Sequence, residues 1–346
     1  TVITAARIAG GGGGGTGQDE NGQEGEGGGV GMVGTPAGAF VIDGGKALRS
    51  ALLTGLGRIL DLLFSRLTWS RAQRLGRAFG RLAWNLARRD RRRTLDHLAF
   101  AFPELAIAER AALARRCFVH LGTVLGECLH LRHCAPQELS QLVALAGWEH
   151  VEAARAQQRP IVIVTGHCGN WELLAAALNA KGLGMLVVAR EIDEPGLQTM
   201  LLDLRARFGT RTIVRGTPGA ARALLGALRG AGALGMLIDQ DTKVEGVFVD
   251  FFGRPAWTPV GAAELALRFD AAVLPTFIER RADGTHRAQI HPVLALPTDS
   301  TAATALMTAA IESQIRSHPE QWVWLHRRWR RRPAGSEGSA DSASPA

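Results

Sequence analysis

Residues 160–178 read PIVIVTGHCGNWELLAAAL, and this stretch decides the fold. Its β-branched run, 161–164, predicts a buried strand, and from residue 170 onward the apolar residues recur at helical spacing. The segment TGHCG between them predicts a tight turn. Asn170 suits the N-cap of the helix, and Glu172 suits its first turn, where a carboxylate interacts favourably with the helix dipole. The stretch therefore predicts the strand–turn–helix unit of an α/β protein.

His167 lies directly after the predicted strand, at the position where open α/β sheets bind ligands. We expect Glu172 to reach its ring across the turn, and a histidine oriented by a carboxylate can deprotonate a hydroxyl group. The alternative is a buried histidine satisfied by a nearby acid. The flanking Gly166 and Gly169 favour catalysis, because they let a substrate approach the backbone. Backbone N–H groups at Gly169 and Asn170 are candidate donors for an oxyanion.

An alternation of strands and helices extends this unit to the C-terminal side. Strands are predicted at 160–165, 184–189, 212–214, 233–238, 272–279 and 287–293, and helices at 148–158, 170–181, 195–208, 218–229, 259–269 and 301–316. This order predicts an α/β fold with a largely parallel central sheet covered by helices. The turn Asp283-Gly284 allows the last two strands to pair as a hairpin.

Amphipathic helices precede the sheet. Apolar positions predict a helix over 46–68, and a second helix, 70–93, carries a leucine-rich stripe on one face and arginines on another. The stripe is Leu75, Phe79, Leu82 and Leu86, and the arginines are Arg74, Arg77, Arg81 and Arg88. Two further helices are expected within 94–135, broken at Phe102-Pro103. The arginine-rich helix is either an ordinary surface helix or one that lies on an anionic membrane, and we favour the membrane.

Composition divides the chain into four parts. The segment 1–45 is Gly-rich without hydrophobic periodicity and predicts disorder, as does the tail 333–346. Between them we expect a helical membrane-associating region, 46–135, and an α/β catalytic domain, 136–332.

The charge balance points to an anionic partner. The chain has 40 Lys and Arg against 32 Asp and Glu, a net charge of +8, which suits nucleic acid, an acidic membrane surface or a phosphorylated substrate. No window of 18 or more apolar residues predicts a transmembrane helix, so we expect peripheral or monotopic association. The spacing of five thiol and imidazole side chains matches no zinc motif, and we expect no metal site among Cys117, His120, His130, His133 and Cys134.

Further polar residues follow other predicted strands. Arg190 ends strand 184–189, either as a clamp on a phosphate or carboxylate or as a surface ion pair. Asp239 and Asp241 follow strand 233–238, where they could bind Mg²⁺, and we favour a structural or substrate-orienting role. The apolar run 247–253, which contains Phe251, Phe252 and Gly253, is either core or the lining of an acyl-chain pocket.

Four ordered blocks of residues resemble the bacterial lysophospholipid acyltransferase superfamily, in particular its lipid A biosynthesis (lauroyl/myristoyl) acyltransferase branch. The first is the hallmark His-x4-Asp/Glu, met by His167 and Glu172. The others are Arg190 with Arg207-Phe208-Gly209, then Asp239-Gln240-Asp241 with 247–253, and finally Pro319-Glu320-Gln321-Trp322 with 324–329. This resemblance implies a glycerolipid acyltransferase-like fold and places the chain at the cytoplasmic face of the inner membrane.

The resemblance also implies a reaction. An acyl thioester, on acyl carrier protein or coenzyme A, would donate a fatty acyl group to a hydroxyl of a membrane glycolipid, with a lipid A precursor expected and another glycolipid or lysophospholipid as the alternative. His167 would be the general base and Glu172 its orienting partner. Substrate contacts are expected from Arg190, Arg207, Asp239, Asp241, Phe251, Phe252 and Gly253, and no cofactor, metal or nucleic acid is expected. More distant alternatives are a metal-dependent hydrolase using His167, Asp239 and Asp241, and a non-enzymatic basic membrane-binding protein.

Overall fold

The computed structural model describes residues 55, 57–192 and 194–333. The predicted disorder at 1–45, and in the tail beyond residue 333, lies outside the described residues. Only part of the predicted helix 46–68 is described, and that part is helical over 57–65. The division at residue 135 between a membrane-associating and a catalytic region stays a prediction.

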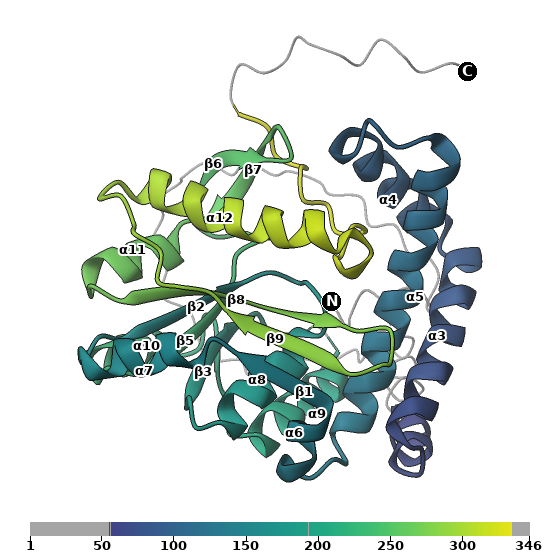
Figure 1. Ribbon diagram of the computed structural model, residues 1–346, viewed down its shortest axis with the longest axis horizontal. Coiled ribbons are helices and arrows are strands. Elements are labelled where there is room, and N and C mark those ends of the chain that lie inside the picture. Colours follow the sequence, from purple (N-terminus) through teal and green to yellow (C-terminus); the bar gives the residue numbers. More distant parts are fainter. Residues whose placement is uncertain (1–54, 56, 193, 334–346) are drawn as a thin grey trace, which may run out of the picture.

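Three helices stand beside the sheet (Figure 1): α3 (Trp69–Leu86), α4 (Arg88–Ala101) and α5 (Ile107–Leu131). Small residues bring the backbones of α3 and α5 together. A Cβ atom at Gly76 would lie 2.4 Å from the carbonyl oxygen of Gly122, and one at Gly80 would lie 2.4 Å from that of Phe118. The two backbones therefore touch, as in the small-residue interfaces of membrane helices.

The predicted helix 70–93 is broken at Ala87, whose backbone has φ −88° and ψ 64°. Neither glycine nor proline marks this break, so the sequence pattern did not reveal it. The break lets α4 turn towards the C-terminal segment, where Arg93 Nη1 donates to the carbonyl of Leu325 at 2.9 Å. His97 Nδ1 lies 2.7 Å from the carbonyl oxygen of Trp324 in the same region.

The central sheet has seven strands in the order β1-β9-β8-β2-β5-β3-β4. Their bounds are β1 (Val143–Ala146), β2 (Ile161–Thr165), β3 (Met185–Ala189), β4 (Arg211–Val214), β5 (Ala233–Leu237), β8 (Ala272–Arg280) and β9 (His286–Ile290). Every pairing is parallel except that of β8 with β9, which confirms both the largely parallel sheet and the expected hairpin.

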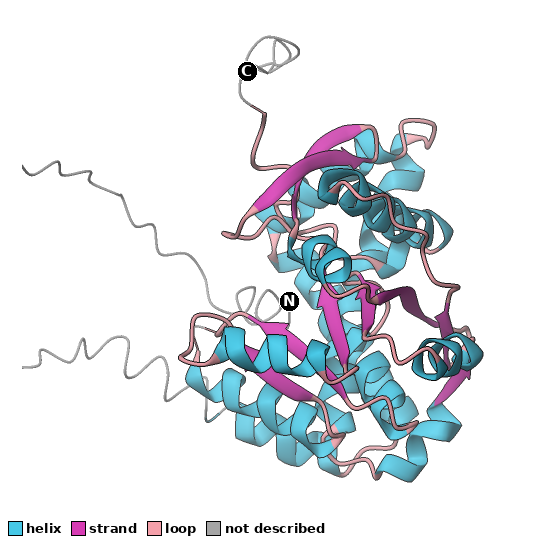
Figure 2. Ribbon diagram, turned by 90° about the vertical axis from the view of Figure 1, so that its left-hand side faces the viewer, coloured by secondary structure: helices cyan, strands magenta, loops and turns pink. Residues whose placement is uncertain are grey.

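Helices cover both faces of this sheet (Figures 1 and 2). They include α7 (Trp148–Ala156), α8 (Trp171–Ala180), α9 (Pro195–Arg207), α10 (Ala220–Arg229), α11 (Gly261–Arg268) and α12 (Ser300–Ser317), together with a short α6 (Leu139–Leu142). All five residues of β2 are buried. Val162 and Val164 belong to the core that contains residues of α11 and α12, whereas Ile161 and Ile163 belong to the core that contains residues of α8. The predicted central strand is therefore the centre of the fold.

Two features were not predicted. Strand β1 forms an edge of the sheet, and a separate hairpin joins β6 (Gly246–Phe251) to β7 (Arg254–Pro259). Its two-residue turn holds Phe252 at φ 58° and Gly253 at φ 71°, a pattern typical of tight hairpins but rare for phenylalanine. The sequence run 247–253 lacks a clear turn signal because an aromatic residue occupies the first turn position.

Candidate active site

The turn after β2 is built around two glycines. Gly169 has φ +58°, and a Cβ atom there would lie 1.9 Å from the carbonyl oxygen of Ile278, so any other residue would collide with β8. A Cβ atom at Gly166 would lie 2.8 Å from a methyl group of Ile311. The predicted N-cap is confirmed, since Asn170 Oδ1 accepts a hydrogen bond from the Leu173 amide at 3.0 Å. These contacts fix the backbone on both sides of His167.

His167 is paired with Asp239. The distance from His167 Nδ1 to Asp239 Oδ1 is 2.7 Å, and the backbone N–H of His167 donates to Asp239 Oδ2, also at 2.7 Å. The sheet register explains the pairing, because Thr165 of β2 lies opposite Leu237 of β5. Two residues beyond each strand end, His167 and Asp239 meet at the same edge.

The Asp239 carboxylate is buried and ionised. Trp322 Nε1 donates to its Oδ2 at 2.7 Å. Burial alone would raise the pKa of Asp239, but the adjacent His167 and the hydrogen bonds from His167 and Trp322 outweigh that effect and lower the pKa to about 2. Because the carboxylate accepts the Nδ1 proton, Nε2 of His167 is the nitrogen left to accept a proton from a substrate.

The exposure of the pair fits this chemistry. The side chain of His167 is 15% exposed and that of Asp239 only 1%, so the ring reaches solvent while its partner does not. Trp171 lies edge-on to the imidazole with ring centroids 5.1 Å apart. An imidazole held by a buried carboxylate in this way can act as a general base.

Glu172 does not contact His167 in the way we expected. Its Oε2 and Oε1 atoms accept hydrogen bonds from Arg205 Nε and Nη2 at 2.9 and 2.7 Å, and the residue is 5% exposed. Glu172 is the second residue of α8, and its bidentate partner projects from α9. Sequence proximity therefore suggested the wrong carboxylate for the imidazole, and Glu172 instead joins two helices.

The residues expected to donate to an oxyanion make hydrogen bonds within the protein. The backbone N–H of Gly169 donates to the carbonyl of Gln321 at 2.9 Å. Asn170 is wholly buried, and its side-chain Nδ2 donates to Glu127 at 3.0 Å. The Gly169 N–H is therefore already used within the protein, whereas the backbone N–H of Asn170 stays a predicted oxyanion donor.

The polar residues that were expected to contact substrate do not all lie near His167. Arg190 follows β3 directly and is exposed, and since β3 runs parallel to β5, Arg190 lies along the edge that carries Asp239. Arg207 instead lies at the end of α9 and donates from Nε to the carbonyl of Cys134 at 2.9 Å. Asp241 is buried and holds the C-terminal segment through Arg330 Nη2 at 3.0 Å. Of these residues only Arg190 combines exposure with a place on the His167 edge.

Phe251 and Phe252 belong to an aromatic cluster rather than to an open pocket. They are 0% and 5% exposed, and their rings contact those of Trp322, Trp324 and Trp329. Gly253 lies at the hairpin turn, where the backbone requires the positive φ that glycine adopts readily. Trp322 connects this cluster to the site, because its Nε1 donates to Asp239.

Sequence reasoning missed two contacts at the candidate site. Trp322 was singled out only by resemblance, and nothing in its local pattern predicted a hydrogen bond to Asp239. Arg205 was missed because its partner, Glu172, was assigned to the imidazole. A signal for Asp239 did exist, since it follows a buried strand of the same sheet.

Comparison with known families gives a match over most of the chain. The model of the family described as bacterial lipid A biosynthesis acyltransferase matches residues 47–331.

Curated relatives carry related names. A lipid A biosynthesis lauroyltransferase of Escherichia coli is 28% identical over 292 residues, which are 82% of this chain and 93% of the relative. A lipid A biosynthesis acyltransferase of Haemophilus influenzae is 27% identical over 72% of this chain and 79% of its own length. A phosphatidylinositol mannoside acyltransferase of Mycobacterium tuberculosis is 30% identical over 54% of this chain and 59% of its own.

Proposed function

Because the chain belongs to the bacterial lipid A biosynthesis acyltransferase family, we propose that it moves a fatty acyl group from an acyl thioester to a hydroxyl of a membrane glycolipid. The observation that carries the proposal is the 2.7 Å contact between His167 Nδ1 and the buried carboxylate of Asp239. Together these residues form a general base at the carboxyl edge of a parallel sheet.

In the proposed reaction His167 Nε2 removes the proton of the acceptor hydroxyl as its oxygen attacks the thioester carbonyl. The imidazolium that forms is stabilised by the charge of Asp239. This attack forms the new C–O bond of the tetrahedral intermediate, and collapse of the intermediate re-forms the carbonyl group and breaks the C–S bond. The imidazolium then returns its proton to the leaving thiolate, so the base is regenerated and no covalent acyl-enzyme is required.

We propose a lipid A precursor as acceptor and an acyl carrier protein or coenzyme A thioester as donor. The names of the E. coli and H. influenzae relatives support this acceptor class, and exposed Arg190 at the same sheet edge offers a guanidinium for an acceptor phosphate. The mannoside name of the mycobacterial relative makes a mannosylated phospholipid the alternative acceptor.

An acceptor panel tests this function. Membranes containing the protein are incubated with labelled acyl carrier protein or coenzyme A thioesters and with a lipid A precursor, lysophosphatidic acid or mannosylated phospholipid. We expect acylated lipid A precursor by mass spectrometry, and the same yield when a chelator is present. Acylation of none of the acceptors would overturn the proposal, whereas product release as free fatty acid that stops with chelator would favour a metal-dependent hydrolase.

We also propose that the N-terminal helices contact an anionic membrane. No helix in the described part of the chain is long and apolar enough to cross a bilayer. Leu75 and Phe79 are half-buried against the protein, but Leu82 and Leu86 are 54% and 63% exposed. Spaced four residues apart on α3, these two leucines lie on one helix face. The C-terminal part of the predicted stripe is thus available to a lipid surface.

Replacing both exposed leucines, as Leu82→Glu with Leu86→Glu, is expected to weaken sedimentation with phosphatidylglycerol-containing vesicles by about tenfold or more, because apolar burial in the interface is lost. The matched control is Leu306→Glu, which changes an exposed leucine on α12. Equal binding by the double variant and the wild type, or an equal loss in the control, would contradict the proposed contact.

A further inference from the structure

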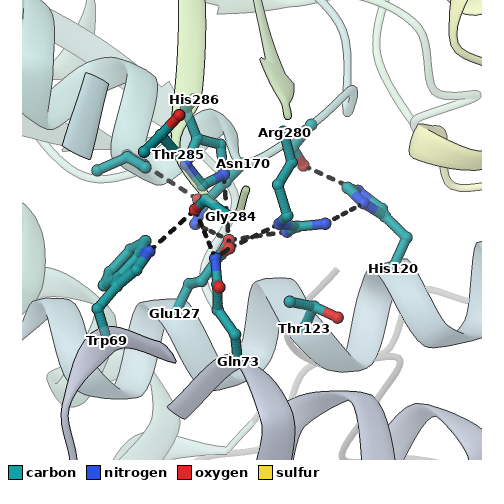
Figure 3. Close-up of polar contacts among 12 residues, drawn as sticks. Trp69, Gln73, His120, Thr123, Glu127, Asn170, Arg280, Gly284, Thr285 and His286 are labelled. Carbon is teal, nitrogen blue, oxygen red and sulfur yellow. Dashed lines mark hydrogen bonds and ion pairs between the residues drawn. The ribbon is translucent and has the colours of Figure 1, made fainter. Parts of the chain in front are cut away.

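A buried carboxylate of the helical region lies beneath the catalytic turn. Glu127 of α5 is 0% exposed, and Figure 3 shows donors converging on it. Arg280 donates from Nε and Nη2 at 2.6 and 2.8 Å, Gln73 Nε2 donates at 2.7 Å and Asn170 Nδ2 donates at 3.0 Å. His286 Nε2 is 3.5 Å away. The positive charge and hydrogen bonds of this shell outweigh burial and lower the pKa of Glu127, so the carboxylate is charged.

Glu127 holds the turn directly through Asn170. The Asn170 side chain donates to Glu127 from Nδ2, while its Oδ1 accepts the Leu173 amide as the N-cap of α8. Both the nitrogen and the oxygen of the Asn170 side-chain amide are therefore hydrogen-bonded, and the bond to Glu127 fixes the orientation of the amide. Asn170 lies three residues after His167, so this contact sets where α8 begins relative to the imidazole.

A second connection runs through Arg280 and His120. Arg280 Nη1 donates to His120 Nδ1 at 2.7 Å, and His120 Nε2 donates to the carbonyl of Gly169 at 3.2 Å. A ring that accepts at Nδ1 and donates from Nε2 is neutral, and burial together with the charge of Arg280 lowers the pKa of His120 well below its usual value. Because Arg280 is itself held by Glu127, the carbonyl of the turn depends on the same carboxylate.

The N–H group of Gly169 is also connected to Arg280. The backbone N–H of Arg280 donates to Gln321 Oε1 at 2.8 Å, and the carbonyl of Gln321 accepts the Gly169 N–H at 2.9 Å. Both backbone groups of Gly169 are therefore hydrogen-bonded, the N–H to Gln321 and the C=O to His120, and each of these two residues is bound by Arg280. The contact of Gly169 with the backbone of Ile278 leaves no room for the turn to shift towards β8.

We infer that Glu127, together with Arg280 and His120, is a positioning element for His167. The imidazole is held on one side by Asp239, and on the other by a turn whose placement depends on this buried network. A shift of about 1 Å in a reacting group can cost about 100-fold in rate. The helices α3 and α5, which contribute Gln73, His120 and Glu127, are therefore part of the catalytic apparatus as well as a supporting layer. This inference rests on the proposed role of His167.

The test compares Glu127→Gln and His120→Ala with a control from the same helical region. Asp61→Asn is the control, because Asp61 pairs with Arg132 and His133 near the end of α5 and is not among the residues that hold the turn. We expect kcat of the folded Glu127→Gln enzyme to fall by about 10- to 100-fold and that of His120→Ala by about tenfold, with KM changed by less than about threefold. The control should keep kcat within about twofold of the wild type.

A spectroscopic measurement separates positioning from mere support of the fold. The low-field proton NMR signal of the His167–Asp239 hydrogen bond should shift or broaden in Glu127→Gln and His120→Ala and stay unchanged in Asp61→Asn. Variants that lose thermal stability but match the control in kcat and in this signal would overturn the inference. His120→Ala keeps the test decisive if Glu127→Gln does not fold. If His167→Ala retains turnover, the proposed role of His167 fails instead, which distinguishes the two failures.

Discussion

A His167→Ala variant is expected to fold and to lose kcat by about 1,000-fold or more. The reason is that Nε2 of His167 is the proposed proton acceptor for the attacking hydroxyl, and general-base catalysis of this kind contributes about 100- to 10,000-fold. The change also leaves the buried Asp239 carboxylate without its imidazole partner, so kcat is compared for the folded variant. Turnover is measured with the thioester donor and the acceptor that the panel identifies.

The control for this variant is His133→Ala. His133 is a similarly accessible histidine, with its side chain 29% exposed, and it pairs with Asp61 rather than with the site. The control should retain near wild-type turnover at matched membrane content. Wild-type kcat in the His167→Ala enzyme would remove the general base from the proposed mechanism.

The second large effect is expected for Asp239→Asn, with kcat reduced by about 100- to 1,000-fold. An amide at this position can donate to His167 Nδ1, which would favour the tautomer whose proton sits on Nε2 and cannot accept one from the substrate. It also removes the charge that stabilises the imidazolium. Asp270→Asn is the matched control, since Asp270 is largely exposed and pairs with Arg159. Equal losses in the two variants would show that the effect is not specific to the site.

The free energy of unfolding should depend on pH through Asp239. The pKa of Asp239 is lowered from 3.8 to about 2 by folding, so the ionised carboxylate stabilises the fold above its unfolded pKa, and this stabilisation is lost as the pH falls towards 2. The shift corresponds to about 2 kcal/mol. Denaturant unfolding of the wild type should lose that amount between about pH 5 and pH 2, and Asp239→Asn should lack this component.

The comparison of Glu172 with Asp239 shows what local sequence cannot decide. Glu172 is five residues from His167 and was the natural partner by distance along the chain, whereas Asp239 is 72 residues away. The choice depends on β5 lying beside β2, which places Asp239 opposite His167, and on α9 bringing Arg205 to Glu172. The order of strands in a sheet is a property of chain crossovers that hydrophobic periodicity does not encode.

The sequence by itself determined the local structure and the position of the candidate base. The β-branched run, the two glycines and the N-cap asparagine specify a strand, a turn and a helix through short-range sterics and hydrogen bonds, so β2, α8 and the position of His167 were predictable. The tertiary structure decided which carboxylate contacts the imidazole, and it placed Phe251 and Phe252 in the core. It also drew Glu127 from a distant helix to the catalytic turn. Each of these depends on contacts between residues far apart in the chain, where burial and charge pairing outweigh sequence proximity.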